Sequence, residues 1–480
     1  MSLFIRKPLE QLMAQAGDSE KGLKRTLGVW NLIALGIGAI IGAGLFVRTA
    51  AAAGEAAGPA VVISYIIGGI GCAFAGLCYA EFASMIPIAG SAYAYAYVTM
   101  GEFMAWIIGW ALVLEYALAS ATVSIAWSEY LNSLLGGSIP YQWCHGPMET
   151  SLNGVTGIIN LPAVSILFLL TLVLIKGTKE SAGLNSIIVV IKVSIVIIFI
   201  VIGWGFINEA NYTPFTIPDQ VGHEGWNRHG WGGVLGGAGI VFFAFIGFDA
   251  VSTAAQEAKN PKRDMPLGIL GSLVICTVLF ILFSHVLTGI ANWEEFKVAG
   301  KEASVVYAIK NHMPGYEWLG TLITGAILAG FSSVILVMLL GQSRVFYSMS
   351  KDGLVPKVFS ELHPKFRTPY KANWILLLFV SLFGGFVPGS VAGDLTSFGT
   401  LFAFVLVCLG IWVLRVKNPE AVRPFRTPLV PLVPILGMII CSLLIYSLDY
   451  KTQLMAFGWL LVGLIVYFTY SKKNSVLRKG

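Results

Sequence analysis

The sequence predicts an all-α integral membrane protein that crosses the bilayer about twelve times. Of the 480 residues, 56% are hydrophobic and only 12% are charged, about half the charge of a typical soluble domain. Apolar windows of about 20 residues, each long enough to span roughly 30 Å of hydrocarbon, recur from Val29 to Tyr470. Because backbone polar groups in lipid must be satisfied internally, these windows are expected to be helices and not open strands.

The apolar windows give the expected boundaries of the spans. In chain order these are 29–53, 58–85, 103–134, 161–176, 184–207, 232–257, 266–290, 317–347, 373–388, 395–415, 429–448 and 453–470. The polar residues 1–28 contain no apolar core of a signal peptide, so the first window is expected to be retained as a span.

The distribution of Lys and Arg predicts the orientation. With an even number of spans both termini lie on one side, and most of the 31 Lys and Arg residues fall in segments on that side. The opposite side has only Arg48, Arg228, Lys297, Lys301, Lys310 and Lys451. Cytoplasmic loops carry the excess of basic residues, so both termini are expected in the cytoplasm of a protein of the cell (inner) membrane.

Two glycine-rich interruptions indicate an inverted repeat. The first span contains Gly36-Ile-Gly-Ala-Ile-Ile-Gly-Ala-Gly44, and the sixth runs from Gly236-Gly-Ala-Gly239 to Phe245-Ile-Gly247. Helices five spans apart cross the membrane in opposite senses, and paired broken helices mark the binding site of many transporters. The expected organisation is a cytoplasmic segment 1–28, a first repeat 29–207, a second repeat 232–415, two further helices in 429–470 and a cytoplasmic tail 471–480.

The glycines of the first span allow three interpretations. Gly38 and Gly42 fit a small-xxx-small packing contact between helices. A dinucleotide-binding loop is excluded, because the third glycine of that fingerprint and a preceding strand are absent. An unwound segment would leave the N–H groups of Ala43 and Gly44 at the start of a second half-helix, where a carboxylate binds favourably.

The sixth span would supply the complementary groups. A break within Phe242–Gly247 would expose carbonyls that suit an ammonium group, so the two breaks together would hold a zwitterion. Phe245 or Phe248 would cover the side chain, with ordinary packing as the alternative for either ring.

Lys192, in the fifth span, is the most informative single residue. A charge about 12 Å inside an apolar helix is costly and is by default a functional hypothesis. Because burial disfavours the charged form of an amine, Lys192 is a candidate proton carrier. The alternatives are a lysine that extends to the interface or a fixed ion pair.

Other polar residues give weaker signals. Glu115 is deep in the third span and would line a pocket or make a structural hydrogen bond. Asp249 follows the second break and would hold a gate or cap the half-helix. His285 is expected to pack in the core. The six cysteines show neither a disulfide framework nor metal-ligand spacing, and the scattered basic residues do not indicate nucleic-acid binding.

Several strings resemble one family. They are Gly36–Phe46, Tyr79-Ala-Glu-Phe82, Gly90-Ser-Ala-Tyr93, Leu114-Glu-Tyr116, Phe243–Ala250, Asn260–Pro266 and Gly341–Pro356. In combination they are similar to the amino acid–polyamine–organocation permeases, and specifically to bacterial relatives of the cationic amino acid transporters.

The resemblance implies a LeuT-type 5+5 inverted repeat with two additional C-terminal helices. It implies a substrate site made of Ile40, Gly42, Ala43, Gly44, Glu115, Phe243, Ala244 and Ile246, to which the aromatic run of the sixth span adds Phe245. It also implies that Lys192 couples transport to protons, with Gly36, Ser332 and Ser333 as partners. Ala43 stands where some relatives have a hydroxyl residue, so this chain lacks one side-chain hydrogen-bonding group at the site.

The expected function is import of L-amino acids, cationic or small neutral, by proton symport with alternating access. The energy source would be the proton gradient, without a cofactor or metal, and the partners would be the amino acid and the lipid bilayer. A proton-independent exchanger or uniporter, a channel and a transporter-like sensor remain alternatives, as do a small membrane subunit and any oligomer. A membrane enzyme is not supported, because no HExxH motif and no pair of catalytic carboxylates is present.

Overall fold

A computed structural model describes residues 3–8, 27–86, 91–151, 153–176, 182–219, 225–255, 258–298 and 304–479. Over these ranges the chain is helical, without a strand, and its only bridges are the isolated pairs Leu27–Ala258 and Thr150–Thr156. The expected segment 1–28 lies mostly outside the described residues, as do residues 256–257 at the end of the sixth expected span.

Eight helical segments within these ranges are long and apolar enough to cross a membrane. Four shorter apolar helices accompany them: Val29–Ile40, Leu161–Lys176, Tyr370–Phe386 and Leu432–Ser447. The chain is therefore an all-helical multi-pass membrane protein, which confirms the fold class in this respect. The count of about twelve spans and the 5+5 repeat stay predictions.

Most of the longer elements overlap the expected windows, and two further helices lie between those windows. In chain order they are α2 (Val29–Ile40), α4 (Val61–Met85), α5 (Ser91–Thr99), α6 (Glu102–Leu134), α8 (Leu161–Lys176), α9 (Ala182–Gly203), α10 (Gly230–Val241), α12 (Pro261–Ile290), α14 (Ser304–His312), α15 (Glu317–Lys351), α16 (Tyr370–Phe386), α17 (Gly389–Lys417), α18 (Leu432–Ser447) and α19 (Tyr450–Val466). Short elements join them: η1 (Gly44–Arg48), α3 (Thr49–Ala52), η2 (Ala53–Ala57), η3 (Gly58–Ala60), α7 (Tyr141–Cys144), η4 (Trp204–Phe206), η5 (Glu209–Tyr212), η6 (Phe242–Phe245), α11 (Ala250–Thr253), α13 (Glu295–Val298), η9 (Lys357–Ser360), η10 (Tyr467–Ser471), α20 (Lys472–Asn474) and α21 (Val476–Lys479).

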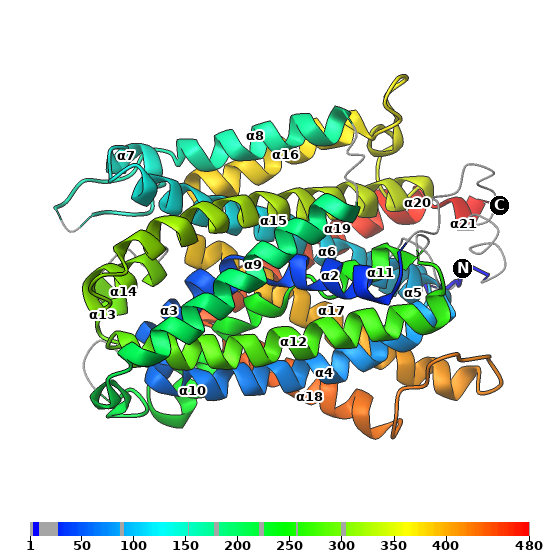
Figure 1. Ribbon diagram of the computed structural model, residues 1–480. Helices are drawn as coiled ribbons and strands as arrows, with labels where there is room; N and C mark the ends of the chain where they lie inside the picture. Colours follow the sequence, from blue (N-terminus) through cyan, green and yellow to red (C-terminus); the bar gives the residue numbers. More distant parts are fainter. Residues whose placement is uncertain are drawn as a thin grey trace.

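The helices form one bundle with a buried centre. Helix α6 packs against both α15 and α17, while α8 and α16 run side by side along one edge (Figure 1). The most apolar stretch of α6 is 78% buried, whereas that of Tyr450–Asn474 is only 22% buried. Because an apolar helix that the protein leaves uncovered must face hydrocarbon, α6 belongs to the interior and α19 to the lipid boundary.

Both termini lie at the same end of the bundle (Figure 1), where they close on one another. From the N-terminal side, the amine of Lys7 contacts the carboxylate of Asp352 at 2.7 Å, just after α15. From the C-terminal side, the backbone N–H of Val476 donates to the carbonyl of the same Asp352 at 3.0 Å. Residues that are far apart in the sequence thus converge on one turn.

A buried carboxylate beside Asp352 completes this contact. Glu102 is fully buried and accepts hydrogen bonds from the hydroxyl of Ser475 and, at 2.6 Å, from the guanidinium of Arg478. We call Lys7, Glu102, Asp352, Ser475 and Arg478 the terminal clasp. Breaking one side of a buried ion pair typically costs about 3–5 kcal/mol, so the clasp holds this end of the bundle closed.

An ion pair fixes the loop between α6 and α8. His145 stacks on Tyr141, and its Nε2 contacts the carboxylate of Glu129 at 2.8 Å. Burial disfavours the charged imidazole, but the hydrogen bond to Glu129 and the charges of Glu129 and Glu149 outweigh it and raise the pKa of His145 to about 9.

The raised pKa predicts a loss of stability in alkali. The pKa of His145 in the folded protein is above its value of about 6.5 in the unfolded chain. The ion pair with Glu129 therefore contributes fully to the free energy of unfolding below pH 6.5, and this contribution disappears as the pH rises through about 9. We expect the Tm of the purified protein to fall more between pH 7 and 10 than that of His145→Gln. Parallel Tm profiles of the two proteins would contradict the assignment.

Candidate substrate and coupling site

The first glycine run interrupts the helix as predicted. The N–H of Ile41 still donates to the carbonyl of Ile37 at 2.9 Å, but Ile41 itself is extended, with φ −73° and ψ 102°. Helical hydrogen bonding resumes when the N–H of Leu45 donates to the carbonyl of Gly42 at 3.2 Å. The last carbonyls of one half-helix and the first N–H groups of the next are therefore left without helical partners.

The second interruption lies against the first. Helix α10 ends at Val241, and after η6 the chain is extended at Ile246. Gly247 has φ +115°, and a Cβ there would be 2.9 Å from the backbone of Ala39. A Cβ on Gly44 would be 2.2 Å from the Cα of Ala244. Glycine is thus required at both positions, because the two unwound segments touch backbone to backbone.

A small cavity lies between the interruptions. One part of its wall is backbone from the two unwound segments, and the rest is apolar side chains from α6 and α15. The lining residues are Ala39, Ile40, Gly42, Ala43, Gly44, Ala119, Val123, Phe243, Ile246, Val334 and Met338. This combination of backbone groups and apolar side chains suits a small molecule with a polar and an apolar part.

Six of the nine residues expected at the substrate site line this cavity: Ile40, Gly42, Ala43, Gly44, Phe243 and Ile246. The ring of Phe245 lies elsewhere, at 5.3 Å from the ring of Phe280 and 6.1 Å from that of Tyr65. The expectation that Phe245 covers the substrate side chain therefore does not fit this conformation. Ala244 contributes close packing, since it fills the space that Gly44 leaves open.

Glu115 also lies outside the cavity lining. It is on α6 one helical turn before Ala119, which does line the cavity, so the acidic side chain is displaced along the helix. Glu115 is only 1% exposed. An acidic wall for a cationic substrate side chain, which the sequence left open, is thus not present among the residues that line the cavity.

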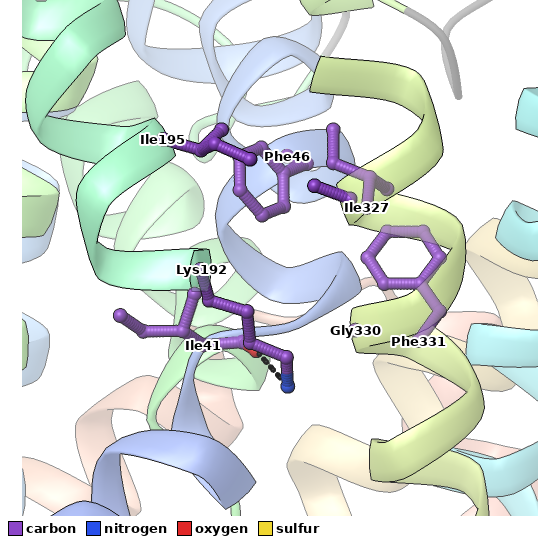
Figure 2. A pocket seen from close by; sticks show the side chains of 8 residues that line it. Ile41, Phe46, Lys192, Ile195, Ile327, Gly330 and Phe331 are labelled. Atoms are coloured by element: carbon purple, nitrogen blue, oxygen red, sulfur yellow. Dashed lines mark hydrogen bonds between the residues drawn. The ribbon is translucent and has the colours of Figure 1, made fainter. Parts of the chain in front are cut away.

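Lys192 reaches from α9 to the first interruption. Its amine donates to the carbonyl of Gly38 at 3.0 Å and to that of Ile41 at 3.2 Å, and the residue is 3% exposed. Figure 2 shows the side chain directed at Ile41, in the wall of a second, apolar cavity. That cavity is lined by Ile41, Phe46, Lys192, Ile195, Ala326, Ile327, Gly330 and Phe331.

The acceptors of the lysine differ from the expected partners. Gly36 lies inside α2 and packs against Ser272 of α12, while the hydroxyl of Ser332 donates within its own helix to Leu328 at 2.9 Å. Ser333 is not among the amine's hydrogen-bond partners in the described part of the chain. The physical reason is that Ile37 has the last carbonyl that accepts a helical hydrogen bond in α2, so free carbonyls begin at Gly38 and not at Gly36.

The sequence prediction missed a pair of charges at the other end of the first interruption. Arg48 is 3% exposed and forms an ion pair with Asp394 of α17. Beyond it, Arg228 contacts both Glu55, at 3.3 Å, and Asp449. Arg48 was treated only as a loop charge, although its position in an apolar run was the signal of a buried cation. We call Arg48, Asp394, Arg228, Glu55 and Asp449 the distal charge network.

Three further polar residues have structural surroundings. Glu81 accepts two hydrogen bonds from Arg415, both at 2.9 Å, which hold the last turn of α17 against α4. The ring of His285 stacks on Tyr212 at 4.9 Å, as expected for a packed histidine. In the described ranges no group of three or more His, Cys, Asp or Glu residues is arranged to hold a metal ion.

Comparison with known proteins agrees with this architecture. The sequence profile described as "Amino acid permease" matches residues 27–469. The branched-chain amino acid permease BcaP of Bacillus subtilis (strain 168) is 42% identical over 481 residues, which cover 100% of this chain and 99% of the relative. The methylthioribose transporter of the same organism is also 42% identical, over 100% of both chains.

A more distant relative extends the comparison. The vacuolar cationic amino acid transporter 4 of Arabidopsis thaliana is 32% identical over 88% of this chain and 68% of its own length. All of these relatives are permeases or transporters, and not enzymes. Together with the interrupted helices and the cavity between them, these matches show that the chain belongs to the amino acid permease family within the amino acid–polyamine–organocation superfamily.

Proposed function

We propose that this permease imports neutral aliphatic L-amino acids together with protons. The observation that carries the proposal is the cavity between the two interrupted helices, which combines free backbone groups with an apolar wall. The cell membrane, with both termini in the cytoplasm, is the location that fits the basic loops.

The backbone groups suit the head group of an amino acid. The N–H groups of Gly42–Gly44 would bind the substrate carboxylate, and the carbonyls near Ile40, Phe243 and Ile246 would bind the ammonium. The side chain would then lie against Val123, Val334 and Met338. Branched-chain transport by BcaP, as its name states, supports an aliphatic substrate, whereas Glu115 lies too far along α6 to line a cationic pocket.

Lys192 would link this site to the proton gradient. With its amine on Gly38 and Ile41, a protonated lysine holds α9 against the first interruption. Tilting of α2 toward the inward-open state would remove both acceptors, so the amine would release its proton to the cytoplasm. In the proposed cycle, this conformation, with both the distal charge network and the terminal clasp formed, would be the occluded step of alternating access.

A substrate screen tests the proposal. Purified protein in liposomes should accumulate labelled Leu, Ile or Val when the outside is acidic, and much less without a pH gradient. Arg, Lys and methylthioribose belong in the same screen, because relatives with those names are similar. Counterflow without dependence on the pH gradient would indicate the exchanger or uniporter, and binding without uptake would indicate the sensor.

Shortening one side chain of the cavity should change the selectivity. Met338→Ala removes apolar contacts, and a missing methylene group costs about 1–3 kcal/mol of discrimination, so we expect Leu uptake to fall roughly tenfold or more while larger side chains gain. The matched control is Met455→Ala, because Met455 on α19 is 44% exposed at the lipid boundary. Equal changes for all substrates would contradict a side-chain role of Met338.

A further inference from the structure

The turn that follows the first interruption is wound more widely than an α-helix. This turn, η1 (Gly44–Arg48), is a π-helix, in which a carbonyl accepts from the N–H five residues further on instead of four. Such turns are rare and are frequently found at functional sites. Because η1 begins at Gly44, which lines the substrate cavity, the winding of this turn determines where the first N–H groups of the half-helix lie.

Two hydroxyl groups in series bind this turn. The hydroxyl of Thr49, the first residue of α3, donates to the carbonyl of Leu45 at 2.5 Å. The hydroxyl of Tyr65, on α4, is 2.6 Å from the oxygen of Thr49 and 3.4 Å from the carbonyl of Gly44. Because the single hydroxyl proton of Thr49 is used on Leu45, Tyr65 is the donor to Thr49. We call Tyr65 and Thr49 the hydroxyl chain.

The hydroxyl chain is more than an ordinary helical contact. A threonine that donates to the carbonyl one turn before it is common in helices. Tyr65, however, comes from a different helix, and both residues of the chain are completely buried. The hydroxyl of Tyr130, from α6, adds a bond at 3.3 Å to the carbonyl of Phe46 in the same turn. Since a buried hydroxyl that loses its partner costs free energy, these contacts hold the π turn in one position.

Tyr65 also contacts the second interruption. Its ring lies edge to face with the ring of Phe245 in η6, at 6.1 Å between centroids, and 5.4 Å from the ring of Phe280 in α12. The hydroxyl of one side chain therefore binds at the first interruption, while its ring packs on the second. Helix α4 thereby gives a fixed position to two unwound segments that lack part of their own helical hydrogen bonding.

We propose that Tyr65 and Thr49 are positioning residues for the substrate carboxylate. Their hydroxyls keep η1 in the π winding that places the N–H groups of Gly42–Gly44 at the cavity. Neither residue is among those that line the cavity, so they act through the backbone and not by touching the substrate. This inference rests on the proposed function, because it takes the carboxylate to bind at those N–H groups.

Removing the hydroxyl of Tyr65 should weaken binding of the carboxylate alone. Tyr65→Phe keeps the ring against Phe245, so we expect the KM for Leu to rise about tenfold with little change in the maximal rate. Leucinol has the same ammonium group and side chain as Leu but no carboxylate. Its inhibition constant should stay at the wild-type value, so the preference for Leu over leucinol should fall about tenfold. Equal losses for Leu and leucinol would leave Tyr65 with a structural role only and overturn the proposal.

Substitutions of Thr49 test whether the two hydroxyls act as a unit. Thr49→Val should reproduce the change caused by Tyr65→Phe, and Thr49→Ser, which retains a hydroxyl, should keep the wild-type KM. The double variant should be no worse than either single variant, because groups in one hydrogen-bond network are not additive. Tyr212→Phe is the matched control, since that hydroxyl donates to the carbonyl of His285 at 3.0 Å, away from the cavity. Additive losses, or a raised KM in Thr49→Ser, would contradict the hydroxyl chain.

Amide hydrogen exchange gives a readout that needs no substrate. The peptide that covers residues 42–50 should exchange about tenfold faster in Tyr65→Phe and Thr49→Val than in the wild type, because the turn opens more easily. Tyr212→Phe should match the wild type. Unchanged exchange in both variants would overturn the positioning role. Absence of Leu uptake by the wild type would instead refute the proposed function, so the two failures can be told apart.

Discussion

Lys192→Met should abolish accumulation driven by a pH gradient. The substitution keeps the apolar stem but removes the amine that donates to Gly38 and Ile41 at 3.0 and 3.2 Å. Each hydrogen bond from a charged group contributes about 1.5–3 kcal/mol. A tenfold change corresponds to about 1.4 kcal/mol. Because the variant loses both hydrogen bonds, we expect gradient-driven uptake to fall about 100-fold or more.

The comparison needs a second lysine variant and a second assay. Lys176→Met removes a lysine from the exposed end of α8 and should leave uptake unchanged. Counterflow exchange by Lys192→Met, measured in the same liposomes, separates coupling from folding, because a carrier that still exchanges has retained its site. Undiminished gradient-driven uptake by Lys192→Met would remove the lysine from the coupling mechanism.

Gly44→Ala should eliminate substrate binding. The added Cβ would stand 2.2 Å from the Cα and 2.7 Å from the backbone N of Ala244, and a backbone contact cannot be relieved by a change of rotamer. Overpacking typically costs about 1–3 kcal/mol, and here it acts by separating the two interruptions that form the cavity. We expect uptake to fall below detection and the thermal shift caused by Leu to disappear.

The chain offers close controls for this variant. Gly325 of α15 and Gly458 of α19 have nothing within 4 Å of an added Cβ, so alanine at either position should support normal uptake. A Gly44→Ala protein that binds and transports like these controls would show that close backbone contact of the two interruptions is not required.

The helices and the two interruptions could be predicted because they depend on local composition. Apolar windows and glycine runs are properties of consecutive residues, and the expected span 317–347 corresponds to α15 (Glu317–Lys351). The location of Lys192 beside the first interruption was anticipated from the resemblance. The carbonyls that accept hydrogen bonds from Lys192 could not be predicted. Four glycines spread over nine residues do not indicate at which residue α2 ends.

The remaining differences concern directions of side chains and contacts between distant segments. Phe243 and Phe245 are two positions apart, yet Phe243 lines the cavity and Phe245 packs against Phe280. The 3₁₀ geometry of η6 determines the direction in which each ring points. The pairing of Arg48 with Asp394 joins positions 346 residues apart in the chain. Such pairs are fixed by tertiary packing, for which a single sequence contains no periodic signal.

The terminal clasp has a consequence for biosynthesis. Ser475 and Arg478, which bind Glu102, leave the ribosome after every hydrophobic segment has been made. Until then the carboxylate of Glu102 lacks these two donors, so the terminal clasp is incomplete while the nascent chain is in the membrane. Insertion of α19 alone would therefore leave this end of the bundle without the ion pair between Glu102 and Arg478.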